Sequence, residues 1–174
     1  VDVAGPDIAV LAAGGISRGR QIAAAFALGA QGVWTGTIWL GTRESELTPM
    51  EKDILFHARS EDAVQRKWMT GKTVRMIKSK ASEAWEQAGA PRHLKPPLQN
   101  MLYHGARIRI EKAKRPDLCS FPAGQVVGNM KEETSVRQVM QDLIEEYAET
   151  AERLALQDGD VDRVVDALSR ALAA

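Results

Sequence analysis

Two short glycine turns carry the clearest chemistry in this sequence. Gly14 and Gly15 follow an apolar run at residues 8–13, and Gly36 with Thr37 follows a second apolar stretch farther on. Glycine lets several backbone N–H groups converge on one phosphate, because no side chain stands in the way. The pair of turns therefore predicts a phosphate site formed by Gly14, Gly15, Gly36 and the Thr37 hydroxyl. The spacing of these glycines is not the G-x-G-x-x-G pattern of Rossmann dinucleotide sites.

The elements around these turns predict an α/β fold. The run at 8–13 is continuously apolar, which is typical of a parallel strand covered on both faces. Ser17 is a candidate N-cap for a helix over 18–28, Gly29 is its expected stop, and a second strand is expected over 31–35. A strand–helix–strand unit of about thirty residues is the size of one right-handed crossover.

The position of the turns suggests part of an α/β barrel. Such barrels bind phosphate in the loops that follow their last two strands, and a complete one needs about 250 residues. This chain has 174 residues and begins with Val1. We therefore expect the C-terminal portion of a TIM (β/α)8 barrel, contributing its last two strands, followed by a mainly helical C-terminal region.

The rest of the chain is expected to be helical with irregular connections. We divide it into 1–48 (barrel strands and phosphate turns), 49–132 (a helical and loop insertion) and 133–174 (C-terminal helices). Periodicity and capping residues predict helices that begin after Thr48-Pro49, over 81–88, over 98–114, over 135–156 and over 161–172, the last one after Asp158-Gly159-Asp160. Residues 119–129 are expected to be a loop.

Residues 12–19 and 27–37 together resemble the C-terminal barrel strands of the nitronate monooxygenase family, also called 2-nitropropane dioxygenase-like. The segment 124–128 resembles that family's Gly-Gln-x-x-Gly segment. The resemblance implies a TIM barrel that binds FMN non-covalently. By motif position it assigns the FMN phosphate to Gly14, Gly15, Trp34, Thr35, Gly36 and Thr37, and it places Gln125 near the flavin and the substrate.

The catalytic residue remains unknown from this sequence. The family has a catalytic histidine on an earlier strand, and no segment of this chain matches that motif. We expect the base to lie on N-terminal strands outside this chain, and we interpret His57, His93 and His104 as surface or packing residues.

The resemblance implies a flavoprotein that oxidises alkyl nitronates or a related small substrate. One alternative is an FMN-dependent enoyl-acyl-carrier-protein or acyl-CoA reductase, with NAD(P)H or an acyl thioester as partner and the basic stretch 66–80 contacting phosphates. Another enzyme class, resembling inosine-monophosphate dehydrogenase, needs a nucleophilic cysteine soon after the glycine turns, whereas Cys119 lies far downstream. A third candidate is a non-enzymatic subunit that requires an N-terminal partner chain or an oligomer.

Composition narrows the remaining classes. Lys and Arg number 23, as do Asp and Glu, so no net charge favours nucleic acid. No apolar run is long enough for a membrane span, and no His/Cys spacing suggests a metal. The single cysteine, Cys119, fits a reducing cytoplasm and is expected to be unreactive. We interpret Glu132-Glu133 and Glu145-Glu146 as solvated surface, and Trp68 and Trp85 as anchors of helices on the barrel exterior.

Overall fold

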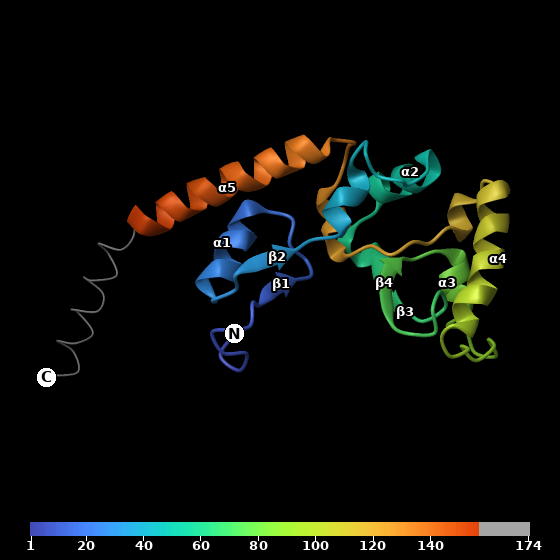
Figure 1. Cartoon of the computed structure of the whole chain (residues 1–174). Helices are drawn as coiled ribbons and strands as arrows, with labels where there is room; N and C mark the ends of the chain where they lie inside the picture. Colours follow the sequence, from blue (N-terminus) through green and yellow to red (C-terminus); the bar gives the residue numbers. More distant parts are fainter. Residues whose placement is uncertain (157–174) are drawn as a thin grey trace, which may run out of the picture. The chain divides into compact units, whose positions relative to one another are not determined.

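The computed structural model describes residues 1–156, so Asp158-Gly159-Asp160 and the helix predicted over 161–172 lie outside the described residues. The chain divides into two compact units. Unit 1 comprises residues 1–34 with the helical segment that starts at Arg137, and unit 2 comprises residues 35–136. Figure 1 labels their helices and strands, and each unit is described by itself below.

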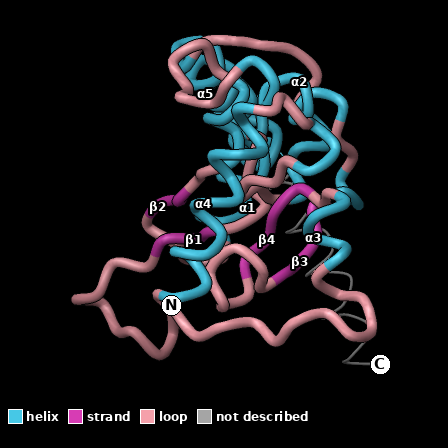
Figure 2. Tube along the Cα trace, turned by 90° about the vertical axis from the view of Figure 1, so that its right-hand side faces the viewer, coloured by secondary structure: helices cyan, strands magenta, loops and turns pink. Residues whose placement is uncertain are grey.

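Unit 1 contains the predicted strand–helix–strand crossover. Strands β1 (Leu11–Ala13) and β2 (Gly32–Trp34) pair in parallel with Ala13 opposite Trp34, and helix α1 (Gly19–Ala27) connects them. Both strands therefore end at the same edge of the pair (Figure 2). The strands are shorter than predicted, and the expected cover on both faces is absent within this unit, because Leu11 is 47% exposed and Trp34 is 70% exposed.

Helix α5 (Val136–Leu156) packs so closely against α1 that position 19 has no room for a side chain. A Cβ on Gly19 would lie 2.3 Å from the carbonyl oxygen of Leu143 and 2.3 Å from the backbone nitrogen of Tyr147. Farther along, the rings of Phe26 and Tyr147 meet edge to face with centroids 5.7 Å apart. Contact between these two helices therefore depends on a glycine at one end and an aromatic pair at the other.

The start of α1 differs from the prediction. Its N-cap is Arg18 rather than Ser17, and the Gln21 side-chain oxygen accepts hydrogen bonds from the N–H groups of Ser17 and Arg18, at 2.8 and 3.0 Å. A side chain from the first turn thus binds the two N–H groups that precede the helix, and the N-cap lies one residue later than predicted.

Unit 2 is built around an antiparallel hairpin that the sequence did not predict. Strands β3 (Ala63–Arg66) and β4 (Val74–Ile77) pair with Gln65 opposite Arg75. The segment after Cys119, expected to be a loop, pairs with the outer side of β4: Ile77 donates to the Phe121 carbonyl at 3.1 Å, and Ala123 donates to the Arg75 carbonyl at 3.2 Å. The hairpin is thus stabilised by chain that lies far from it in sequence.

The helices of unit 2 are α2 (Pro49–His57), α3 (Lys80–Ala84) and α4 (Leu98–Lys112), with short 3₁₀ helices η1 (Thr37–Gly41), η2 (Ser60–Asp62), η3 (Pro116–Leu118) and η4 (Gln125–Asn129) between them. In Figure 1, α3 and α4 lie on one side of this hairpin and α2 lies above it. Helix α2 begins as predicted, because Thr48 accepts a hydrogen bond from the Glu51 N–H and the Glu51 carboxylate accepts one from the Thr48 N–H. Helix α4 ends two residues earlier than predicted, shortly before Lys114, whose φ is 48°.

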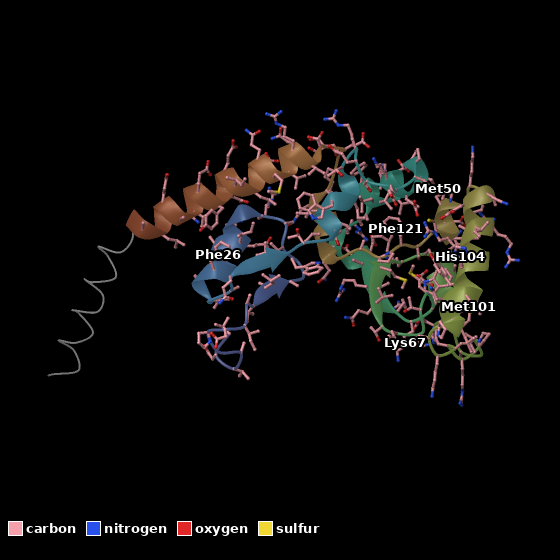
Figure 3. All side chains as sticks on the ribbon, in the orientation of Figure 1. Phe26, Met50, Lys67, Met101, His104 and Phe121 are labelled. Atoms are coloured by element: carbon pink, nitrogen blue, oxygen red, sulfur yellow. The ribbon has the colours of Figure 1, made fainter. Side chains whose placement is uncertain are left out.

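Two apolar clusters form the core of unit 2. The first contains Leu55, Ala58, Ala63, Ile77, Cys119, Phe121, Ala123 and Val127, and Figure 3 labels Phe121 within it. The second contains Trp68, Met69, Met76 and Tyr103. Trp68 was predicted to anchor a helix on a barrel exterior. Instead, it joins the hairpin region to α4. No helix among residues 1–156 is long and apolar enough to span a bilayer.

Candidate functional site

The turn at residues 35–37 is held in place by side chains and amides of unit 2. The Trp39 indole N–H lies 3.1 Å from both the carbonyl and the hydroxyl oxygen of Thr35, while the Trp39 amide donates to the Gly36 carbonyl at 3.1 Å. The Thr37 hydroxyl oxygen accepts a hydrogen bond from the Gly124 N–H at 2.8 Å. Because the oxygen of Thr37 acts as acceptor, its hydroxyl proton is left to donate to a ligand.

A shallow hollow of about 380 Å³ lies beside this turn. It is lined by Gly36, Thr37, Leu40, Arg75, Pro122, Ala123 and Gly124. Three segments that are distant in sequence meet there: the turn before η1, strand β4 and the segment that leads into η4. Arg75 is the one charged residue among the lining residues, so the hollow is electropositive.

Gly36 shows that the hollow has room for a ligand against the backbone. Its φ is −129°, outside the left-handed region that favours glycine, and a Cβ built on it would meet no atom within 4 Å. Packing within the chain therefore does not require a glycine at this position. A glycine also leaves room for close approach of a group from outside the chain. This observation fits an anionic cofactor group at the turn.

The second predicted turn, in unit 1, is different. Gly14 and Gly15 have φ values of 94° and 73°, so their backbone conformation alone favours glycine, and a Cβ on either would meet open space. The Gln21 side-chain amide donates to the Gly15 carbonyl at 2.8 Å. The backbone N–H groups of residues 17–19 already donate to side chains. A ligand at this turn would therefore use the amides of Gly14 and Gly15.

The N-terminus of α1 already holds an anion from the chain itself. The Glu146 carboxylate accepts a hydrogen bond from the Gly19 N–H at 2.7 Å and pairs with Arg20 at 3.4 Å. Glu146 is therefore a structural cap rather than the solvated side chain that was predicted. Its negative charge compensates the positive end of α1, the helix end that the sequence predicted to attract a phosphate.

The remaining predicted site residues are both exposed. Trp34 ends β2, and its side chain is open to solvent. Gln125 begins η4 directly after Gly124, and it is not among the residues that line the hollow. Sequence reasoning missed Trp39, which fixes the turn, and it considered Arg75 only as one member of a basic stretch.

The other candidate groups of the described chain have structural surroundings. His57 and His104 are exposed, and His93 stacks near Trp85 with ring centroids 5.3 Å apart. Burial raises the pKa of the Cys119 thiol to about 11, as expected of an unreactive cysteine. Glu133 is bound to Lys52 rather than being purely solvated. Within residues 1–156, no group of three or more His, Cys, Asp or Glu side chains is arranged to hold a metal ion.

Comparison with known proteins decides the family. A family model described as nitronate monooxygenase matches residues 1–146. The chain belongs to the nitronate monooxygenase family. The resemblance predicted from the two glycine turns is thereby confirmed.

The curated relatives of this chain in the nitronate monooxygenase family are longer than the chain itself. A Mycobacterium tuberculosis protein named as a monooxygenase is 43% identical over 83% of this chain and 40% of its own length. A Bacillus subtilis protein named as a nitronate monooxygenase is 34% identical over 80% of this chain and 40% of its own. The chain thus spans about two fifths of the length of these curated relatives.

Solved structures show the same relationship. The nitroalkane oxidase of Streptomyces ansochromogenes superimposes with a TM-score of 0.73 and 31% identity, over 86% of this chain and 42% of that one. FabK from Thermotoga maritima gives a TM-score of 0.68 at 31% identity, over 85% of this chain and 47% of that one. The fold described here is therefore part of a larger α/β enzyme fold, within which β1 and β2 form one crossover.

Proposed function

We propose that this chain is the FMN-binding C-terminal part of a flavin-dependent oxidoreductase that oxidises alkyl nitronates. The observation that carries the proposal is the turn 35–37, where packing does not require Gly36 to be glycine and its backbone borders an electropositive hollow. Membership of the nitronate monooxygenase family supports it independently. When bound, the flavin would accept electrons from the substrate and pass them to an acceptor.

The residues of this chain would bind and orient the cofactor rather than move a proton. Thr37 would donate its hydroxyl proton to the phosphate, and the Gly36 backbone would allow the close approach. Gln125 would lie near the flavin ring, and a phosphate role of Gly14 and Gly15 in unit 1 stays a prediction from the sequence. The catalytic base that the family resemblance implies is assigned to no residue here, and we place it on strands outside this chain.

Reduction of an enoyl thioester remains a second candidate, because it predicts a use for the basic stretch 66–80. The contacts of that stretch favour it less. The Lys78 ammonium pairs with Asp62 at 2.8 Å, and Arg66 pairs with Glu86 at 3.8 Å. These two charges are already balanced within unit 2 and provide little free positive potential for a thioester's phosphates, whereas Arg75 of the same stretch forms no ion pair among the described residues.

Flavin reduction under anaerobic conditions separates the candidates. Protein that includes the strands proposed to carry the base is loaded with FMN and mixed with an alkyl nitronate, and the absorbance of oxidised flavin is followed. We expect the absorbance to fall with nitronate and to remain with an enoyl thioester alone. If photoreduced protein is instead reoxidised by an enoyl thioester, the reductase assignment replaces ours. Protein that binds no flavin would favour the non-enzymatic subunit.

A further inference from the structure

We propose that Arg75, on strand β4, binds the phosphate of the cofactor and supplies the main positive charge of the phosphate site. This inference deepens the proposed function and rests on it. Arg75 belongs to neither glycine motif, and its place in the hollow appears only when the hairpin folds. It is a positioning residue for the cofactor and takes no part in proton transfer.

The guanidinium of Arg75 is fixed in place without being neutralised. Its Nη1 donates to the Ala63 carbonyl at 2.8 Å, across the hairpin, which holds the half-buried side chain in one orientation. An arginine has five N–H donors, so others remain for a ligand. No carboxylate of the described residues forms an ion pair with Arg75, whereas Arg59, Arg66, Arg107 and Arg115 each pair with at least one.

The partners around Arg75 complete an anion site. Thr37 lines the same hollow and offers a hydroxyl proton, and Gly36 exposes its backbone there. A half-buried cation, a hydroxyl and an open backbone without any carboxylate are the groups that bind a phosphate. Because Ala123 donates to the Arg75 carbonyl, the segment that carries Gly124 and the strand that carries Arg75 are held together.

The charge of the hollow itself supports the assignment. A dianionic phosphate needs a positive charge close to it. Arg75 meets this need, since it lines a hollow that contains no acidic residue.

The test compares FMN with riboflavin, which lacks the phosphate, by equilibrium dialysis of the purified protein. The variants are Arg75→Met, the conservative Arg75→Lys, and the control Arg66→Met on the neighbouring strand β3, which lies outside the hollow. Losing a charge-assisted contact should weaken FMN binding by roughly 10- to 100-fold. Riboflavin affinity should change less than about twofold in Arg75→Met, Arg75→Lys should be intermediate, and Arg66→Met should bind both flavins normally.

Each outcome bears on one claim. If Arg75→Met weakens FMN and riboflavin equally while melting at the wild-type temperature, Arg75 does not bind the phosphate and the inference fails. If Arg75→Met melts at a lower temperature than the wild type, Arg75→Lys decides the question. The inference is overturned if Arg75→Lys keeps the wild-type preference for FMN over riboflavin and no other variant loses it. Wild-type protein that binds both flavins equally, or neither, contradicts the proposed phosphate site itself.

Discussion

At the scale of single residues, Gly36 and Gly124 line the same hollow but differ in what an added side chain would meet. A Cβ on Gly36 meets nothing within 4 Å, whereas a Cβ on Gly124 would lie 3.2 Å from the Thr37 hydroxyl oxygen. The first glycine is open to a ligand, and the second is needed to bring its N–H to Thr37. Substitutions at the two positions should therefore affect different properties.

We expect Gly36→Ala to leave the melting temperature nearly unchanged and to weaken FMN binding at least about tenfold, because the added methyl blocks approach to the backbone. Gly124→Ala is the matched comparison, and it should lower the melting temperature as well, since it pushes on Thr37. Differential scanning fluorimetry and flavin titration measure the two effects. Normal FMN affinity in folded Gly36→Ala would refute the ligand-binding role of that turn.

Tyr103 gives a pH-dependent prediction in the core of unit 2. Burial raises its pKa to about 12, and its hydroxyl donates to the Ser120 carbonyl at 2.9 Å. An unfolded tyrosine loses its proton near pH 10. The stability that the neutral phenol contributes is therefore complete below about pH 10 and is lost as the pH rises toward the folded pKa.

Replacement by phenylalanine removes this titration. Tyr103→Phe should cost about 1 kcal/mol at neutral pH, since the buried Ser120 carbonyl loses a donor. Denaturant unfolding of both proteins from neutral to strongly alkaline pH should show their stabilities converging above about pH 10. Curves that stay parallel over that range would contradict the assignment of a buried neutral phenol.

At the scale of elements, glycine-to-alanine substitutions in α1 and in α4 should have opposite effects on stability. Gly19 lies against the α5 backbone, whereas a Cβ on Gly105 in α4 would meet only the Arg109 guanidinium, at 4.0 Å. Gly19→Ala should destabilise by about 1–3 kcal/mol through overpacking. Gly105→Ala should stabilise by about 0.5–1 kcal/mol, because alanine favours the helix. Chemical denaturation measures both, and equal effects would show that α1 and α5 do not meet at Gly19.

The elements also show what the sequence could predict. Helices α2 and α5 follow from local signals, namely the Thr48–Glu51 capping pair and the apolar repeat after Ser135. The β3–β4 hairpin has no such local signal, because β4 is stabilised by hydrogen bonds to Phe121 and Ala123, which lie far along the chain. The same limit applies to the site. Gly36 and Thr37 were found from a local motif, while Arg75 reaches the hollow only through long-range strand pairing.

At the scale of the whole molecule, unit 1 exposes apolar residues around a two-stranded parallel sheet. Ile8, Leu11, Leu28 and Trp34 are all exposed, and each strand has one edge that pairs with no other strand among the described residues. Parallel strands are normally covered on both faces. The curated relatives are also much longer than this chain. We therefore propose that this surface is covered by other polypeptide in the working enzyme.

This proposal predicts that the isolated chain associates as its concentration rises. Sedimentation velocity over a range of concentrations should show species heavier than a monomer, and replacing Leu11 with serine should reduce them. The exposed Glu61→Gln substitution in unit 2 is a control that should leave association unchanged. A chain that remains monomeric at all concentrations would indicate that the apolar surface needs no partner.

The central claim is that the turn at residues 35–37 and its electropositive hollow hold the phosphate of FMN. The most direct measurement is the mass of any small molecule released when the protein, purified without added flavin, is denatured. We predict FMN, released in a molar ratio approaching one to the protein. Release of a different nucleotide, or of no small molecule from protein that also fails to take up added FMN, would contradict the claim.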